Sequence, residues 1–243
     1  METIEQTLNH FGLTLLVIGS VGLTLLAIIS LNAKKLTEHK KELLFFGIVA
    51  ATVVPTLFLA ISTVYINMIS SSGGPVHWHA DMEVWACGKE LDLKNPEGLS
   101  NKIGTATLHE HNDKRIHVEG VVVEPHHVSL GSFFEVIGGE LTSQLLIVPT
   151  DEGKRPFITG QSCSTNERAE VQVFVYTIDE AKYYSQQKLE YPHEYILTGT
   201  PHVPDGDCII VEYGPKKEKT EKLCRSYRVA EEIGKLKGER NGN

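Results

Sequence analysis

The first 70 residues and the rest of the chain follow different hydrophobic patterns. Residues 11–32 and 44–69 are two apolar stretches without a charged side chain. A helix needs roughly 20 residues to cross a hydrocarbon core about 30 Å thick, so each stretch is long enough to span a membrane. Pro55 falls inside the second stretch, where a membrane helix tolerates it and commonly bends. The pattern predicts a transmembrane helical hairpin over residues 1–72.

The charges that flank the two stretches predict their orientation. The connecting segment carries Lys34, Lys35, Lys40 and Lys41, whereas residues 1–6 carry two Glu and no Lys or Arg. Loops rich in Lys and Arg stay in the cytoplasm. We therefore expect a two-pass plasma-membrane protein whose termini and main domain face outwards. The alternative is a cleaved signal peptide followed by one anchor, which the acidic start disfavours because signal peptides begin with basic residues.

Beyond residue 72 the chain changes to short stretches separated by turn signals. Apolar residues at alternate or consecutive positions predict strands in "HWHADMEVWACG", "ATLHEH", "RIHVEGVVV", "QLLIVP", "VQVFVYT" and "DCIIVEYG". Ser129 is the expected N-cap of a helix in "SLGSFFEVIGG", "IDEAKYYSQQKLE" reads as a short helix or loop, and an amphipathic charged helix closes the domain. The fold class is α+β, with a mostly antiparallel β-rich domain over residues 73–237 and a disordered tail at 238–243.

The first of these strands has a polar face rich in potential metal ligands. Side chains at i and i+2 of a strand share a face, so His77, His79, Asp81 and Glu83 are expected on one side. The apolar residues between them, such as Trp78, are expected on the side that faces the core.

The hairpin around the turn "NDK" repeats this pattern. His109 and His111 share one face of their predicted strand, and His117 shares a face with Arg115 and Glu119. The hairpin brings its three histidines together, and His77 and His79 join them if the first strand lies beside it.

Five histidines in this arrangement indicate a metal site. Neutral imidazole is the commonest protein ligand for zinc and copper, and three histidines with an open position are how catalytic zinc is held. The nearby carboxylates of Asp81, Glu83 and Glu119 suit a fourth ligand, an orienting hydrogen-bond acceptor or, for Glu119 in an enzyme, a general base. A structural histidine network or a pH-sensing surface is the alternative. The remaining outer-domain histidines are expected to be ordinary surface residues: His126, His127, His193 and His202.

The four cysteines do not form a CxxC pair, which disfavours a zinc knuckle or a thioredoxin-type site. Outside the cytoplasm disulfides persist. We favour Cys208 with Cys224, because the closing helix can fold back on the last strand, and Cys87 with Cys163 then follows by elimination. Buried free thiols are the alternative.

Charge and motifs exclude several classes of protein. The net charge of −8 and the pI near 5.8 disfavour a nucleic-acid-binding protein. The sequence has no Walker A loop, GxGxxG, GxSxG or HExxH motif.

Several stretches carry a family resemblance: "HWHADMEVWACGKELDL", "LHEHNDKRIHVEG", "SLGSFFEVIGG" and "VPDGDCIIVEYG". They resemble a family of uncharacterised, membrane-anchored extracytoplasmic proteins of bacteria and archaea, over roughly residues 76–214. The resemblance implies that His77, His79, His109, His111, His117 and Glu119 act as one unit, and it implies no activity. The turn differs from the family pattern because Asn112 stands where Asp usually follows the second His, and Asp113 is the residue that would replace it.

Three hypotheses follow from the sequence. The leading one is a membrane-tethered extracytoplasmic protein that binds or delivers zinc or copper on the histidine cluster. The second is a metal-dependent hydrolase or other metalloenzyme, and the third is an envelope interaction module with structural histidines and no metal. The expected partners are the lipid bilayer and a metal ion; a membrane-protein partner of the hairpin stays open, and nucleic acid is not expected.

Overall fold

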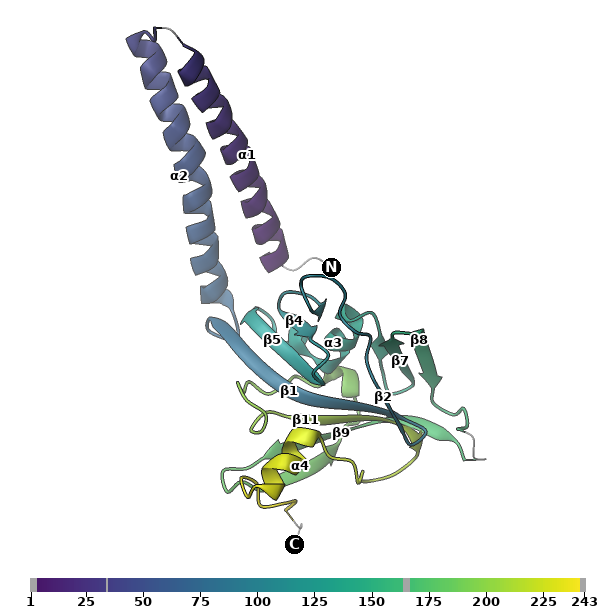
Figure 1. Cartoon of the computed structure of the whole chain (residues 1–243). Coiled ribbons are helices and arrows are strands. Elements are labelled where there is room, and N and C mark those ends of the chain that lie inside the picture. The colour runs from purple at the N-terminus through teal and green to yellow at the C-terminus, as the bar shows by residue number, and fades with distance from the viewer. Residues whose placement is uncertain (1–3, 34, 164–166, 241–243) are drawn as a thin grey trace. The chain divides into compact units, whose positions relative to one another are not determined.

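The computed structural model describes residues 4–33, 35–163 and 167–240 (Figure 1). The chain divides into two compact units, Met1–Gly73 and Gly74–Asn243. The first unit is a pair of helices, α1 (Ile4–Asn32) and α2 (Glu38–Ile69). The second unit holds every strand, so the division falls where the hydrophobic pattern of the sequence changes.

The two helices of the first unit approach each other closely through small residues. A Cβ atom added to Gly12 would lie 2.6 Å from Leu59 Cδ2, and one added to Gly19 would lie 2.7 Å from the carbonyl oxygen of Ala51. Glycine at such positions lets helix backbones meet. Pro55 lies inside α2 and is one of its few buried residues.

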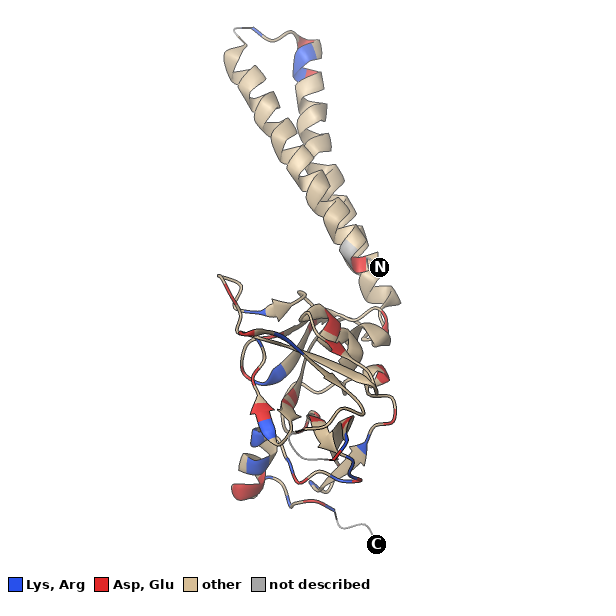
Figure 2. Ribbon diagram, turned by 90° about the vertical axis from the view of Figure 1, so that its right-hand side faces the viewer, with Lys and Arg blue, Asp and Glu red and all other residues tan. Residues whose placement is uncertain are grey.

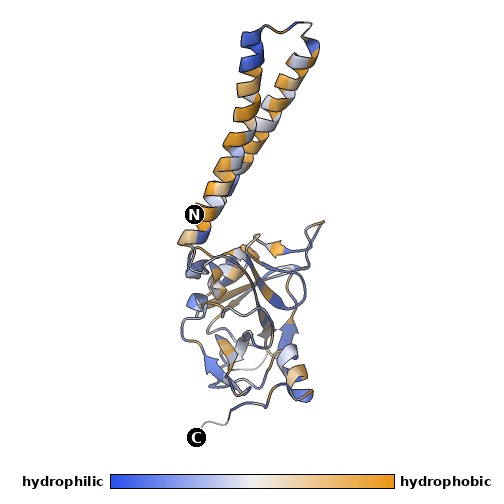
Figure 3. Cartoon of the chain, turned by 90° about the vertical axis from the view of Figure 1, so that its left-hand side faces the viewer, coloured by the Kyte–Doolittle hydropathy of each residue, from blue (hydrophilic) through white to orange (hydrophobic). Residues whose placement is uncertain are grey.

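Both helices are long and apolar enough to cross a membrane, over Thr7–Asn32 and Glu38–Ile69. Most of their surface is hydrophobic (Figure 3), and charged residues gather near the connecting loop and the first turn of α1 (Figure 2). Lys34, one of the lysines expected to orient the hairpin, lies outside the described residues. The helices indicate a membrane anchor, and the two faces of the membrane are not distinguished by them.

The second unit is built on an eight-stranded sheet in which β10, β9, β11, β1, β5, β4 and β3 are neighbours in that order and β2 pairs with the end of β1. The strands are β1 (Pro75–Ala86), β2 (Lys89–Leu91), β3 (Ile103–Gly104), β4 (Leu108–Glu110), β5 (Arg115–Val121), β9 (Ala169–Ile178), β10 (Tyr184–Lys188) and β11 (Cys208–Pro215). Each pairing is antiparallel except that of β1 with β11.

A smaller sheet and four short helical elements complete the described part of the unit. The sheet contains β6 (Glu140–Leu141), β7 (Leu145–Thr150) and β8 (Gly153–Ile158), all antiparallel. The helical elements are η1 (Pro125–Val128), α3 (Leu130–Val136), η2 (Pro192–Glu194) and α4 (Arg225–Glu232). The fold is thus α+β, with two N-terminal apolar helices, a mostly antiparallel sheet domain and a C-terminal helix, as predicted.

The central strands of the large sheet are buried on both faces. Val173 of β9 and Ile209 of β11 belong to the larger core cluster, which also contains Phe133 of α3. Phe174 and Ile210, the next residues along the same strands, belong to a second cluster on the opposite face, under α4. Strands covered on both faces read as continuous apolar runs rather than alternating ones, which explains "VQVFV" and "CIIV".

β1 differs from these strands because only one of its faces is apolar. Ala80, Met82 and Val84 are buried in the larger core. The residues between them belong to the opposite face, as the sequence predicted. β1 therefore supplies core packing and polar chemistry from the same twelve residues.

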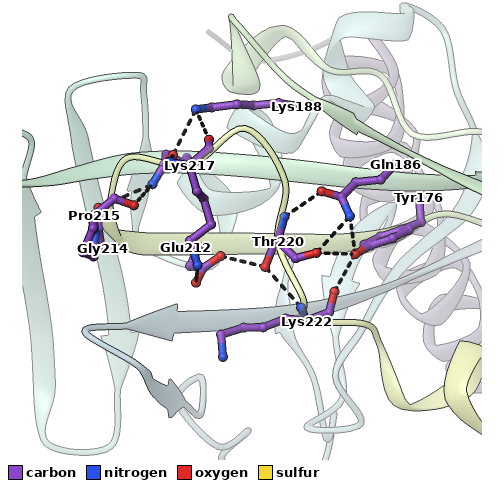
Figure 4. Close-up of polar contacts among 10 residues, drawn as sticks. Tyr176, Gln186, Lys188, Glu212, Gly214, Pro215, Lys217, Thr220 and Lys222 are labelled. Carbon is purple, nitrogen blue, oxygen red and sulfur yellow. Dashed lines mark hydrogen bonds and ion pairs between the residues drawn. The ribbon is translucent and has the colours of Figure 1, made fainter. Parts of the chain in front are cut away.

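Two segments differ from the predicted elements. "IDEAKYYSQQKLE" contains strand β10 rather than a helix, paired with β9 at the edge of the sheet. The closing helix is only Arg225–Glu232, because the residues before it bond to the sheet instead (Figure 4). The Thr220 amide donates to Gln186 Oε1 at 2.7 Å, its hydroxyl donates to Glu212 Oε2 at 2.8 Å, and the Tyr176 hydroxyl donates to the Lys222 carbonyl at 2.7 Å.

The end of the chain is partly ordered. Glu239 forms a bridge with Tyr184 of β10, and the Arg240 amide donates to the Tyr184 carbonyl at 2.8 Å. The rest of the segment expected to be disordered, residues 241–243, lies outside the described residues.

All four cysteines are paired. Cys87 bonds Cys163 across 76 residues of sequence, and Cys208 bonds Cys224 across 16. This is the pairing that the sequence favoured. The second bridge attaches the N-cap of α4 to the first residue of β11, next to the Asp81 carbonyl that Cys224 contacts.

Removing either disulfide is expected to destabilise the outer domain. Loop-closure entropy gives about 3 kcal/mol for the 16-residue separation and about 4.5 kcal/mol for the 76-residue one, so we expect the larger loss for Cys87→Ala/Cys163→Ala than for Cys208→Ala/Cys224→Ala. The chain has two tryptophans, Trp78 and Trp85, and both lie in β1. Thermal unfolding of the full-length protein in detergent, followed by tryptophan fluorescence, therefore reports on this domain alone; unchanged melting of both double variants would contradict the expectation.

Candidate metal centre

The antiparallel register of β1, β5 and β4 brings three histidines into one row across the sheet. His79 of β1 lies opposite His117 of β5, and His117 lies opposite His109 of β4. Directly opposed residues on neighbouring strands have Cβ atoms about 5 Å apart, so their side chains interact. Two residues further along the pairing of β1 with β5, His77 lies opposite Glu119. The strands that carry the row are neighbours in the view of Figure 1.

The imidazole rings form a continuous group. Ring centroids lie 4.6 Å apart for His77 and His79, 4.7 Å for His79 and His117, and 4.8 Å for His117 and His111. His109 lies 4.8 Å from His111 and stacks on His117 at 5.6 Å with its ring nearly parallel. All five histidines singled out in the sequence therefore belong to one cluster.

Within this cluster two sets of side chains can each converge on a single ion. In each set the potential ligand atoms lie within 4.8 Å of one another. We call the first the inner set, made of His109, His111, His117 and Glu119, and the second the outer set, made of His77, His79 and His117.

The two sets differ in their exposure to solvent. The side chain of His109 is 0% exposed and that of His117 is 10% exposed, whereas that of His77 is 62% exposed. The inner set therefore lies at the buried end of the cluster and the outer set at its surface.

His109 is the most unusual member because it is buried without a partner. Neither Nδ1 nor Nε2 has a hydrogen bond among the described residues. Its nearest carboxylate oxygen, Oε2 of Glu119, lies 3.8 Å from Nε2, beyond hydrogen-bond distance. Burial, with a smaller contribution from the charge of Lys102, lowers the pKa of His109 to about 4, and the charge of Glu119 opposes this only in part. The ring is therefore neutral near pH 7, which is the form that binds metal ions.

Backbone carbonyls orient two further rings. Nδ1 of His79 lies 2.5 Å from the carbonyl oxygen of Pro201, and Nδ1 of His111 lies 2.5 Å from that of Asn101. A carbonyl oxygen only accepts, so in both rings Nδ1 carries the proton and donates it. The lone pair then resides on Nε2, the arrangement by which outer hydrogen bonds prepare histidine ligands. Burial also lowers the pKa of His79, although the bond to Pro201 opposes it.

Asp113 orients the shared ring of His117. Nε2 of His117 lies 3.1 Å and 3.3 Å from the two carboxylate oxygens of Asp113. Burial alone would raise the pKa of Asp113, but the hydrogen bond and charge of His117 and the Arg115 amide lower it overall. The carboxylate accepts a hydrogen bond from the Nε2–H group, which leaves Nδ1 of His117 as the nitrogen with the lone pair, buried and without a hydrogen-bond partner among the described residues.

Glu119 contacts both sets. Its Oε1 lies 3.1 Å from Nε2 of His77, and its Oε2 faces Nε2 of His109 at 3.8 Å. It is therefore placed to be a carboxylate ligand of the inner set.

The two other carboxylates proposed from the sequence are engaged elsewhere. Oδ1 of Asp81 accepts from Arg115 Nε at 2.7 Å. Glu83 accepts from the Arg225 amide at 3.1 Å and lies 3.5 Å from Arg228. Both are buried, and neither belongs to the two sets of the cluster.

The histidines expected to be ordinary surface residues lie apart from these sets. His126 and His127 form a separate group with Glu124, which is largely exposed. His193 lies beside Gly131 of α3, and His202 is exposed. Sequence reasoning set the first pair aside because adjacent residues of a strand face opposite ways; the 3₁₀ helix η1 instead brings their rings to 4.2 Å.

A cavity of about 560 Å³ adjoins the cluster. Its walls include the Asp81–Arg115 ion pair, Asp113 and residues of α4 such as Val229. Asp113 therefore belongs to both the cluster and the cavity: its carboxylate contacts His117, and the same residue lines the cavity wall. The turn "NDK" pointed to Asp113, whereas no sequence signal pointed to the backbone carbonyls of Asn101 and Pro201, which come from loops.

Comparison of the chain with protein-family models found no match, and searches of curated proteins and of solved structures found no significant match. The family resemblance of the sequence motifs thus stays a prediction. Function has to be argued from the geometry of the cluster.

Replacing His109 by leucine is expected to stabilise the metal-free protein. A buried polar group without a partner costs roughly 1–3 kcal/mol, which an apolar side chain of similar size removes. The measurement is the tryptophan-monitored melting temperature of the full-length protein in excess chelator. His111→Leu is the matched control, because that ring has a hydrogen bond to lose. A His109→Leu variant that melts below the wild type would assign the ring a structural role instead.

Proposed function

With no matching family to supply a function, we propose that the protein is a membrane-tethered metal-binding protein that holds a zinc or copper ion on the histidines of β1, β4 and β5. Binding or delivery of that ion is its role. The observation that carries the proposal is His109, neutral and buried with both nitrogens unpaired, within 4.8 Å of the other ligands of the inner set. Such a buried, unpaired side chain lowers the stability of the folded protein, and a metal ion bound to the ring would offset that cost.

The donor atoms favour zinc or copper in the divalent state. Three imidazoles and one carboxylate offer nitrogen and oxygen ligands, which suit Zn²⁺ and Cu²⁺. Monovalent copper prefers sulfur. Neither the inner set nor the outer set contains a sulfur ligand. The cysteines are all in disulfides, and Met82 is buried in the larger core.

The side of the membrane is part of the proposal. The disulfides suit an oxidising compartment, and the lysines of the loop between α1 and α2 favour a cytoplasmic loop. Together they support a two-pass plasma-membrane protein with the histidine cluster outside the cytoplasm. The lipid bilayer and the metal ion are then its partners.

A metal-dependent hydrolase is the second candidate, because the cavity beside the cluster is of a size that accommodates small molecules. A bound zinc ion would supply an activated water, and Asp113 is the residue through which the cluster reaches this cavity. Glu119 would be the base, since its carboxylate faces the buried ring of His109 at 3.8 Å. An interaction module with structural histidines is the third, and it predicts no metal.

Metal analysis of the full-length protein, purified in detergent without a histidine tag, tests the proposal. We expect close to one zinc or copper ion per chain, lost in His109→Ala/His111→Ala. His126→Ala/His127→Ala is the matched control, since it also removes two histidines and disrupts the exposed group with Glu124. A folded wild-type protein that takes up no metal after reconstitution, or that loses its metal only in the control variant, would overturn the proposal.

The proposed orientation predicts which single cysteines can be labelled from outside the cell. Every native cysteine is in a disulfide, so an introduced one is the sole free thiol. Leu99→Cys, at a fully exposed position of the outer domain, should react with a membrane-impermeant maleimide in intact cells, and Thr37→Cys in the loop should react only after permeabilisation. The reverse pattern would place the domain in the cytoplasm.

A further inference from the structure

We infer that the outer and inner sets are two positions of one ion, which is captured at the surface by His77, His79 and His117 and passes to the inner set through His117. This inference rests on the proposed metal binding and adds the path by which the ion enters and leaves. It makes the outer set a separate functional element rather than a surplus of ligands.

The first step of the argument is that His117 belongs to both sets. Its ring lies 4.7 Å from that of His79 on one side and 4.8 Å from that of His111 on the other. It is opposite His79 in the pairing of β1 with β5 and opposite His109 in the pairing of β4 with β5. An ion held by either set therefore contacts the same ring.

The second step is that His117 has one nitrogen to offer. Asp113 accepts a hydrogen bond from Nε2 through both of its oxygens, so Nε2 carries a proton. The lone pair of Nδ1 is the one that remains, and one lone pair coordinates one ion. The inner and outer sets cannot both be complete at once, which makes the two positions alternatives.

The third step is the gradient of exposure and ligand number between the sets. An ion arriving from solvent meets His77 first, since its side chain is 62% exposed, whereas that of His109 is 0% exposed. The outer set provides three imidazoles, and the inner set provides three imidazoles and a carboxylate. The additional negative charge and the exclusion of water strengthen binding in the inner set, so capture is favoured at the surface and retention inside.

Glu119 couples the two positions. Its Oε1 now holds Nε2 of His77 at 3.1 Å. When Glu119 turns to a metal ion in the inner set, its contact with His77 is released. The ion exchanges one ligand at a time over a few ångströms, and apart from the released Glu119–His77 contact only metal–ligand bonds form and break.

The test is the rate of metal uptake by full-length protein in detergent, with Co²⁺ as a spectroscopic probe in a stopped-flow instrument. In the wild type we expect about one ion per chain at saturation. His77→Ala/His79→Ala should still reach that occupancy, but roughly tenfold more slowly. A rate difference of this size is typical of a surface that raises the local concentration of an ion and so speeds its association. His109→Ala should bind rapidly and release its ion rapidly to EDTA, because only the outer set is left.

Two variants make the comparison specific. His117→Ala should show neither the rapid binding expected of His109→Ala nor the slow uptake expected of His77→Ala/His79→Ala, because it removes the ligand that both sets share. His126→Ala/His127→Ala, which removes two histidines outside both sets, should load at the wild-type rate. Should the outer double variant fail to fold, as judged by tryptophan melting, His77→Ala alone replaces it, because that ring is mostly exposed.

Three outcomes would overturn the inference while leaving metal binding in place. One is two ions per wild-type chain. Another is uptake by His77→Ala/His79→Ala at the wild-type rate, and the third is loss of the final occupancy in that variant. Absence of metal from the wild type and from every variant would instead overturn the proposed function itself.

Discussion

The cluster depends on the register of three antiparallel strands. β5 presents His117 to β1 and β4 at once, while Ile116 and Val118 point into the larger core. A slip of one residue between strands moves every side chain to the opposite face, so it would turn His117 into the apolar core and move Ile116 and Val118 out of it. The ion pair of Asp81 with Arg115, opposed in the same register at 2.7 Å, opposes such a slip because it would leave a buried carboxylate unpaired. Asp81 thus helps to fix the register of the strands that carry the site.

The same arrangement concentrates an unfavourable interaction at one residue. His109 is fully buried with two nitrogens lacking partners, which opposes folding in the absence of an ion. The rest of the domain is built to tolerate this. The large sheet carries a core on each face, and each face is also tied by a disulfide. Functional sites commonly depart from the rule that buried polar groups are paired, and the surrounding structure compensates.

Much of the fold was predictable because local patterns agreed with the final environment. The alternation in residues 76–84 identified the polar face of β1, and the turn after His111 identified the β4–β5 hairpin. Ser129 caps α3 as predicted, since its hydroxyl accepts from the Ser132 amide. β10 was not predicted because it lies at a sheet edge with polar side chains such as Gln186, so it lacks the apolar alternation of a strand.

The parts of the site that sequence reasoning missed depend on tertiary contacts. Alternation placed His109 on a polar face, but its side chain is fully buried, and β3 pairs beside β4 with Gly104 opposite His109. The approach is so close that a Cβ atom on Gly104 would lie 2.5 Å from the Leu108 carbonyl. Asp113 reaches His117 because Asn112 and Lys114 on either side of it adopt positive φ values, 63° and 60°. Such backbone geometry belongs to the folded turn and leaves only a weak trace in residue type.

The inner set has a consequence for how the domain folds. Its four ligands all lie between residues 109 and 119, within one hairpin, whereas the outer set needs β1 and the large sheet needs β11 from about a hundred residues later. Closing a short loop costs much less entropy than joining distant segments. An ion present during folding can therefore bind the hairpin before the long-range strands assemble, and the four ligands it gathers fix the β4–β5 register in advance. Under the proposed function, the metal would then act as a folding nucleus for the sheet, and the metal supply would influence how quickly the domain matures.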